Sequence, residues 1–301
     1  MTPSTLIPQA TSPAAFLQRR LGLALRDKVA GTDAVERAAE IWGKEGPRWF
    51  GPSEPIARVH ANASMYAGGL AALLLQALHP KAMAGVAGHS GYRGDPWGRL
   101  QRTSLYIATT TFGTIDDATM LAEHVKVIHQ RVRGKDHRGR PYRASDPELL
   151  RWVHDAEISS FLAAYQAYSG HRLSPREADI YVDQTRLASE LLGATGLPRS
   201  AAELDAQMTA YRRDLEVTEA AKDVARFILR DPPVAGPLRP GYGLLVGGAL
   251  AIVPPWAREM LELPLPTPLT SVARGAGLVG TAGVRWALSA VSEGRDPANA
   301  Y

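Results

Sequence analysis

A face of polar side chains runs along the helix that the sequence predicts from Asp95 onward. Three- and four-residue steps place its members on one side of an α-helix, where a solvent-facing stripe normally carries Lys, Glu and Gln. Two interpretations fit: an exposed helix of unusual composition, or a buried polar site whose guanidinium and hydroxyl groups could stabilise negative charge. Threonine is a poor former of exposed helices, which favours the buried site. The members are Arg99, Thr103, Tyr106 and Thr110, with Arg102 close beside them.

Two histidines occur on the next predicted helix, "DDATMLAEHVKVIHQRVRG". His124 and His129 are five residues apart, so they cannot bind one ion together as an i, i+4 pair does. We expect them at opposite edges of the helix's apolar core stripe. A lone histidine there is more often a packed residue bonded to a carbonyl, although one neutral imidazole in an apolar pocket is also what a haem iron binds. The expected stripe consists of Leu121, Val125, Ile128 and Val132.

Two further histidines have positions that the sequence can interpret. His154 shares a helix face with Ile158 and Phe161, which predicts a half-buried residue or one that orients a ligand from behind it. His79 ends an apolar helix directly before Pro80, where a charged imidazolium would interact favourably with the helix dipole. We assign no role to the other histidines.

Composition limits the class of protein. The 301 residues are 45% hydrophobic with a net charge of +4, which fits one large domain or two small ones. The absence of cysteine excludes a disulfide framework, a thiolate metal ligand and a cysteine nucleophile. The first residues show no basic segment leading into an apolar one, so we expect no signal peptide and a cytoplasmic protein.

Neither nucleic acid nor a membrane span is expected. The densest basic stretch, from Arg131 to Arg143, contains Gly and Pro and predicts a solvated surface loop with no stacking platform. Two apolar runs, 65–78 and 241–255, fall short of the ~18 to 20 residues of a spanning helix, so we expect central helices wrapped by others. Peripheral contact with a membrane stays open, and so does the oligomeric state.

The fold class predicted from the sequence is all-α. Capping residues precede the predicted helices, apolar residues recur at three- and four-residue steps, and glycines follow the helix ends. We expect a single multi-helix domain over 1–301, with 1–12 loose and 264–301 forming a Pro-rich linker and a C-terminal helix. The start signals are Asp95-Pro96, Asp146-Pro147, Ser174 with Glu177, and Ser200 with Glu203.

Several separated motifs together resemble one family. The run "LLLQALHPKAMAGVAGHSGYRGDPWGRLQRT" is followed by "FG", "VIHQRVRG" and "YRASDPELLRWVH", and later by "IVPPWARE". Their order and spacing are similar to the DUF2236 family, the catalytic domains related to latex-clearing rubber oxygenases and to the fungal oxygenase of mycophenolic acid biosynthesis. The resemblance is close from Gly68 to His154 and looser beyond it.

That resemblance implies a haem b enclosed in a globin-like helical core. His129 falls at the position of the axial iron ligand, and Arg99 and Thr103 match the pair that lines the oxygen side. Arg102, or arginines nearby, would pair with the haem propionates, and Tyr106 would line the same wall. His124 and His154 are included among the candidate haem-binding residues, since either could compete with His129.

Two departures from the family pattern bear on the substrate. Rubber oxygenases have a lysine before the threonine that can close onto the iron, and here Arg102 stays protonated and cannot. Their glutamate base has no counterpart near Met83. We therefore expect a haem-dependent oxygenase, or another oxidoreductase, acting with dioxygen on a small apolar molecule rather than on polyisoprene. The alternatives are a non-catalytic haem- or lipid-binding protein, and a helical hydrolase or structural bundle.

Overall fold

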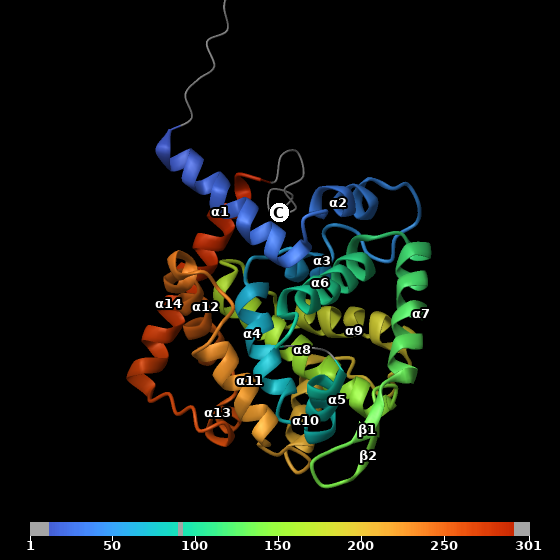
Figure 1. The fold of residues 1–301 in the computed structure, drawn as a ribbon. Coiled ribbons are helices and arrows are strands. Elements are labelled where there is room, and N and C mark those ends of the chain that lie inside the picture. The colour runs from blue at the N-terminus through green and yellow to red at the C-terminus, as the bar shows by residue number, and fades with distance from the viewer. Residues whose placement is uncertain (1–11, 90–92, 292–301) are drawn as a thin grey trace, which may run out of the picture.

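The computed structural model describes residues 12–89 and 93–291, and the regular secondary structure within these ranges is almost all α-helix (Figure 1). The all-α prediction is confirmed. The prediction for residues 1–12 lies, except for Ser12, outside the described residues. The helices are α1 Pro13–Ala30, α2 Ala34–Gly43, α3 Pro55–His60, α4 Met65–Gln76, α5 Pro80–His89, α6 Pro96–Phe112, α7 Ile115–Arg131, α8 Pro147–Tyr168, α9 Pro175–Leu192, α10 Ala201–Tyr211, α11 Glu219–Leu229, α12 Arg239–Ile252, α13 Pro255–Met260 and α14 Thr267–Ser289.

The predicted helix starts are confirmed by their capping geometry. The Asp95 carboxylate accepts a hydrogen bond from the Gly98 backbone N–H at 2.9 Å and so begins α6. Asp146 begins α8 in the same way. Ser174 and Glu177 form a complete capping box at the start of α9. Each cap satisfies backbone N–H groups that have no partner within the first turn, which fixes where the helix begins.

A short β-hairpin replaces part of the predicted basic loop. β1 (Arg133–Lys135) pairs antiparallel with β2 (Pro141–Arg143). The Asp136 carboxylate holds the turn, since it accepts hydrogen bonds from the backbone N–H groups of Arg138 and Arg140. Three-residue strands are too short for an alternating pattern to reveal them in the sequence.

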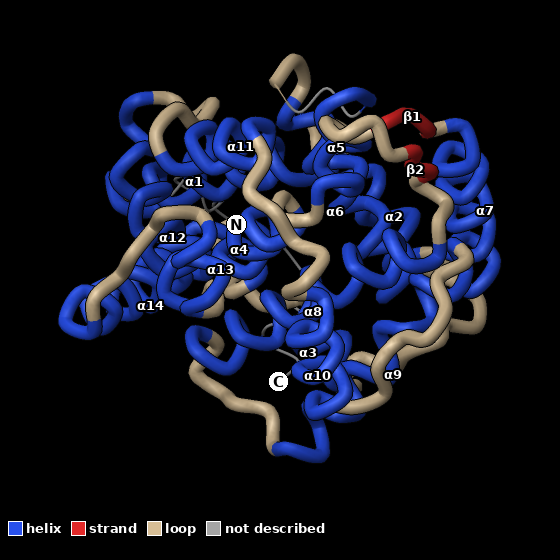
Figure 2. Tube along the Cα trace, turned by 90° about the horizontal axis from the view of Figure 1, so that it is seen from below, coloured by secondary structure: helices blue, strands red, loops and turns tan. Residues whose placement is uncertain are grey.

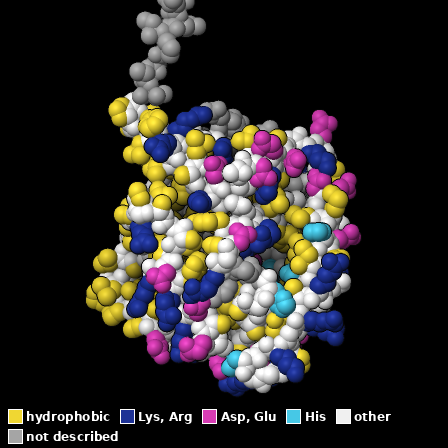
Figure 3. All heavy atoms as spheres, viewed as in Figure 1, with side chains coloured by type: hydrophobic (Ala, Val, Ile, Leu, Met, Phe, Trp, Pro, Cys, Tyr) yellow, Lys and Arg dark blue, Asp and Glu magenta, His cyan; other side chains and the backbone are white. Residues whose placement is uncertain are grey.

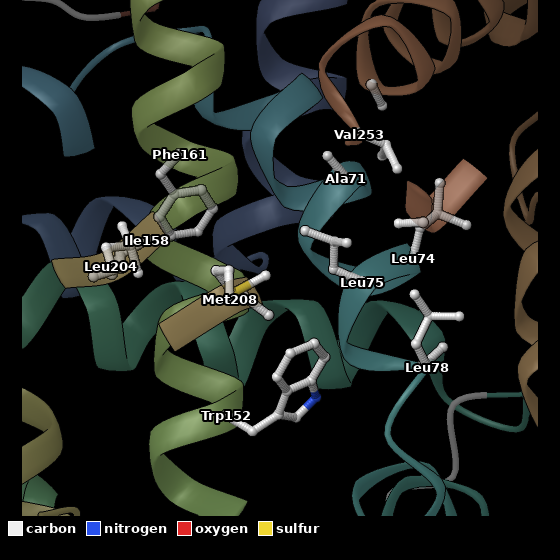
Figure 4. Close-up of a cluster of buried hydrophobic side chains, with 14 of the residues drawn as sticks. Ala71, Leu74, Leu75, Leu78, Trp152, Ile158, Phe161, Leu204, Met208 and Val253 are labelled. Carbon is white, nitrogen blue, oxygen red and sulfur yellow. The ribbon is translucent and has the colours of Figure 1, made fainter. Parts of the chain in front are cut away.

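The main core lies between α4, α8 and α10 (Figure 4). α4 is buried along most of its length, as expected for a helix wrapped by others. Trp152 of α8 is fully buried, and its indole N–H donates to the Gln76 carbonyl at the end of α4 at 3.4 Å. Burial of this size provides most of the stability of such a fold. α8 is therefore the rigid centre on which other side chains are positioned.

A second layer consists of α12, α14 and α1. Seen from below, α12 and α14 lie on one side of α8, and α7 and α9 lie on the other (Figure 2). The Pro-rich segment after α13 leads into α14 as predicted. The second apolar run is covered by α4 and α14 only in its later part, because Gly241 and Gly243 at the start of α12 are exposed.

The apolar helices do not reach the length of a membrane span. Among the described residues, a single helix that is long and apolar enough to cross a bilayer is not found. α4 and α5 reach that length only together, and the chain bends by 108° between them.

Candidate functional site

A recess lined by polar groups lies on the side of the molecule formed by α6, α7 and α9. α6 packs on α7, α7 packs on α9, and α9 packs on α8. Figure 3 shows histidine side chains gathered beside a hollow on this side. Several polar side chains on these helices are half-buried, among them Arg99, Tyr106 and His129.

His129 lies on the inner face of α7. Steps of four, three and four residues connect Ala118, Ala122, Val125 and His129, and the two alanines are fully buried. The Nδ1 atom of His129 is buried and has no hydrogen-bond partner. Burial lowers the pKa of its imidazole, which favours the neutral ring that metal ions bind.

His124 does not share this position. Five residues separate it from His129, which is about 140° around the helix axis. Its side chain is exposed on the outer face of α7. The prediction that the two histidines flank one core stripe is wrong, because the buried face of α7 is rotated toward Ala118 and Ala122. Ile128, expected in the core, is 45% exposed.

The polar stripe of α6 crosses from solvent to the interior. Thr103 is exposed and Arg99 is half-buried, whereas Thr110 is buried and donates to the Tyr106 carbonyl at 2.8 Å. The Tyr106 hydroxyl donates to the Ala188 carbonyl of α9 at 2.7 Å. This bond orients the stripe toward α9, across the recess. Of the two sequence interpretations, the buried site holds for the second half of the stripe.

Arg102 has a different environment from its neighbours on α6. Its guanidinium forms an ion pair with Asp95 at 3.3 Å, and the side chains are 65% and 61% exposed. An exposed pair of this kind contributes little to stability. In this structure Arg102 is thus engaged at the outer start of α6, and the expected role in the recess has no geometric support.

A carboxyl group on α8 lies near the tyrosines of α6 and α9. Burial raises the pKa of Glu157, on α8, to about 7. Burial also raises the pKa of Tyr106 and of Tyr181, and the nearby charge of Glu157 raises both further. The three side chains come from α8, α6 and α9, so the tertiary fold brings them together. The sequence did not indicate Glu157 as a site residue.

His60, the last residue of α3, contacts this group of side chains. Its Nδ1 lies 2.8 Å from the Thr111 hydroxyl, and its Nε2 lies 3.4 Å from the Tyr181 hydroxyl. Burial lowers its pKa to about 3, so the ring is neutral. Because both ring nitrogens have partners, His60 positions Tyr181 and is not available as a metal ligand. Its place near a helix end gave no sign of this role.

His154 is more deeply buried than the sequence indicated. Its Nδ1 lies 2.9 Å from the Ser189 hydroxyl of α9, and its Nε2 is buried without a partner. Burial, with a smaller effect of the Arg186 charge, lowers its pKa to about 3. Its second nitrogen could therefore still orient a neighbouring group or compete for a metal ion.

A separate polar pocket of about 630 Å³ opens between α8, α10 and the hairpin. His79 lines it, and burial lowers the pKa of His79 to about 4. The imidazolium expected at the end of α4 is therefore wrong, because the neutral ring lies against Trp152, 6.0 Å between ring centroids. Arginines and carboxylates both line this pocket, so its charge selects no single ligand class.

The fold and its polar groups define a class: an all-helical protein whose α6, α7 and α8 carry an arginine, a neutral imidazole and a carboxyl group of raised pKa at half-buried positions. Residues 57–287 match the family described as the ER-bound oxygenase mpaB/B′ and rubber oxygenase catalytic domain. The chain belongs to this family of oxygenase domains, which confirms the resemblance found in the sequence.

Two relatives are themselves uncharacterized. Mb2261 of Mycobacterium bovis and Rv2237 of Mycobacterium tuberculosis are each 28% identical to this chain over 102 residues, which is 34% of the chain and 40% of the relative. The chain thus matches less than half the length of either protein. No solved structure shows a significant similarity.

Proposed function

We propose that this protein is a haem b-dependent oxygenase that acts on a small apolar molecule. Membership in a family of oxygenase catalytic domains supports an enzyme that uses dioxygen and an organic substrate. The observation that carries the haem assignment is His129, an inward-facing neutral imidazole whose buried Nδ1 has no protein partner. The globin-like enclosure of the haem, and the cytoplasmic location expected from the sequence, stay predictions.

The residues of the recess fit a haem better than a protein-ligated ion. The described residues contain no cluster of three or more His, Asp or Glu side chains that could hold a metal ion. A haem would need no such cluster, because the porphyrin itself holds the iron and a single imidazole would be enough to attach it to the protein. When bound, the haem would supply a redox-active iron for dioxygen chemistry. His129 would hold it, and His154 is the second candidate.

The α6 stripe would provide the charge of the oxygen-binding side. Arg99 is half-buried and carries a permanent positive charge. The exposed Thr103 hydroxyl donates to the Arg99 carbonyl at 3.1 Å, so it would have to turn from this bond to reach a ligand. Groups of this kind stabilise negative charge that develops on an oxygen atom during a reaction. Arg102 cannot replace the lysine of rubber oxygenases as an iron ligand, because arginine stays protonated.

Glu157 is our candidate for the proton acceptor that the sequence lacked. The family's glutamate would fall near Met83, but Met83 is buried in the core and 2% exposed. Glu157 instead reaches the recess from α8, beside Tyr106. A carboxyl group with a pKa of about 7 can hold or release a proton near neutral pH.

Titration with hemin tests the proposal, with absorbance of the Soret band as the readout. The wild-type chain and His124→Ala should bind about one hemin per chain, and His129→Ala should lose the Soret band of the ligated haem. The His124 variant is a matched control because it removes an imidazole from the outer face of the same helix. A wild-type protein that stays colourless with hemin contradicts the proposal.

Oxygen uptake in the presence of a reductant separates an enzyme from a non-catalytic haem- or lipid-binding protein. We expect Arg99→Ala to retain the Soret band and to reduce uptake by about 10²-fold, the effect of losing one group that stabilises charge in a reaction. Unchanged uptake in this variant would remove Arg99 from the mechanism.

A further inference from the structure

The outward face of α14 is apolar along its whole length. Val272, Val279 and Trp286 recur at seven-residue intervals and are 68%, 61% and 44% exposed. Leu269 and Leu278 add exposures of 53% and 50%. Seven-residue steps keep side chains on one face, and fourteen residues of helix span about 21 Å.

The start of α1 extends this surface. Gln18 donates from its side-chain amide to the Trp286 carbonyl at 2.7 Å and to the Ser289 hydroxyl at 3.1 Å. These bonds hold the beginning of α1 against the end of α14. Phe16 and Leu17, 59% and 53% exposed, directly precede Gln18 on this part of α1. We call these exposed side chains of α1 and α14 the apolar flank. Figure 3 shows hydrophobic side chains gathered along this side of the molecule.

The fold does not need these side chains. α14 packs on α12 and α1 through the opposite face, where Gly277, Gly280 and Val284 are buried. Scattered exposed apolar residues are normal in soluble proteins, but a continuous surface of this extent marks an interaction site. Among the described residues, α7 exposes three large apolar side chains, Met120, Val127 and Ile128, whereas α14 exposes five.

The charges of the two helices distinguish between possible partners. α14 contains Arg274 and Arg285 and no acidic residue. α1 contains four basic residues and a single acidic one, Asp27, which pairs with Arg26 at 3.1 Å. Arg20 lies one turn from Phe16 on the exposed side of α1. A second copy of this surface would bring like charges together, whereas an anionic lipid surface complements them.

We propose that the apolar flank docks on the surface of an anionic lipid bilayer. The apolar side chains enter the boundary between headgroups and acyl chains, with α1 and α14 parallel to the membrane plane. The arginines beside them contact the lipid phosphates, which bind guanidinium groups well. This is attachment to one leaflet and requires no spanning helix. It does not depend on the bound haem or on the oxygenase assignment.

Cosedimentation with vesicles tests the proposal on the full chain. We expect binding to phosphatidylcholine vesicles that contain phosphatidylglycerol, weaker binding to phosphatidylcholine alone, and loss of binding as salt is raised. Val272→Glu/Val279→Glu should weaken binding at least about tenfold. Val35→Glu/Met120→Glu is the matched control, since these residues are 59% and 65% exposed on α2 and α7 and should leave binding unchanged.

A second variant tests the charges without altering the apolar side chains. Arg20→Glu/Arg274→Glu should weaken binding to the anionic vesicles and leave binding to the neutral ones unaffected. Equal binding to both vesicle types, or equal loss in the control variant, contradicts the proposal. Light scattering without lipid provides a further check. If the wild type is a dimer and Val272→Glu/Val279→Glu is a monomer, the flank is an interface between copies, and the proposal is contradicted.

Discussion

The charge of Glu157 depends on its buried surroundings. Burial raises its pKa to about 7, so the carboxyl group changes charge near neutral pH. If it accepts a proton during the reaction, oxygen uptake should rise as pH increases through this pKa, because only the carboxylate can accept. Glu157→Gln should lower the uptake and abolish this rise. The measurement is the pH profile of uptake at constant haem content.

A structural role for Glu157 would give a different result. Glu157→Gln would then change the amount of bound haem or the melting temperature, and the pH profile would keep its shape. Glu40→Gln, at an exposed position of α2, is the control for the loss of one carboxylate. If the pH profile of oxygen uptake is the same in the wild type and in Glu157→Gln, Glu157 is not the proton acceptor.

At the scale of residues, the sequence indicated the groups that lie on one helix and missed those that meet across helices. Steps of three and four residues placed Arg99 and Tyr106 on one face, because spacing within a helix determines direction. His60 and Glu157 belong to α3 and α8, and they approach Tyr181 only through packing. Their roles depend on contacts between residues that are distant in the chain, and single-sequence periodicity does not contain them.

At the scale of elements, α12 and α14 approach each other through glycines. A Cβ atom at Gly277 would lie 2.6 Å from the Tyr168 ring and 2.7 Å from the Gly248 Cα atom. Gly277→Ala should therefore force the helices apart and lower the free energy of unfolding by about 1 to 3 kcal/mol. Thermal unfolding followed by circular dichroism measures the change as a lower melting temperature.

Gly283→Ala is the matched control on the same helix. A Cβ atom there meets nothing within 4 Å. The substitution should raise stability by about 0.5 to 1 kcal/mol, because alanine loses less backbone entropy than glycine when it enters a helix. Equal effects of the two substitutions would show that the close approach of α12 and α14 is not maintained in solution.

The first residues of α6, α8 and α9 could be predicted from the sequence, because capping residues fix where these helices begin. The sequence did not predict which side of α7 is buried, because its apolar residues are compatible with more than one buried face. The choice is made by packing: Ala118 and Ala122 allow α7 to lie close to its neighbours, whereas the larger Ile128 stays outside. That rotation directs His129 inward and His124 outward, so the identity of the candidate ligand depends on an element that the sequence left ambiguous.

At the scale of the whole molecule, buried titratable groups give the stability a dependence on pH with two opposite slopes. His60 and His154 have a pKa of about 3 in the fold against 6.5 for a free imidazole. Between these values the unfolded chain binds protons that the folded chain does not. The contribution of these two histidines to stability should therefore rise as pH increases from about 3 to 6.5.

Asp155 produces the opposite slope. It is 0% exposed, neither carboxylate oxygen has a hydrogen-bond partner, and burial raises its pKa to about 8 from 3.8, although the Arg151 charge lowers it in part. Between these values the folded chain keeps a proton that the unfolded chain has released. The free energy of unfolding should then fall as pH rises, by at most about 1.4 kcal/mol per pH unit for this one group.

Asp155→Asn isolates this contribution, because an amide has nearly the shape of the carboxyl group and no charge to bury. The melting temperature of the variant should exceed that of the wild type by an amount that grows from pH 5 to pH 8. The free energy of unfolding of the variant should still fall slightly between about pH 4.5 and pH 7, because the pKa of Glu157 is raised in the same direction. Asp116→Asn, at an exposed position of α7, should follow the wild type at every pH. If the difference between Asp155→Asn and wild type is constant across this range, Asp155 is ionised in the folded protein, and the interior of α8 contains a compensating positive charge.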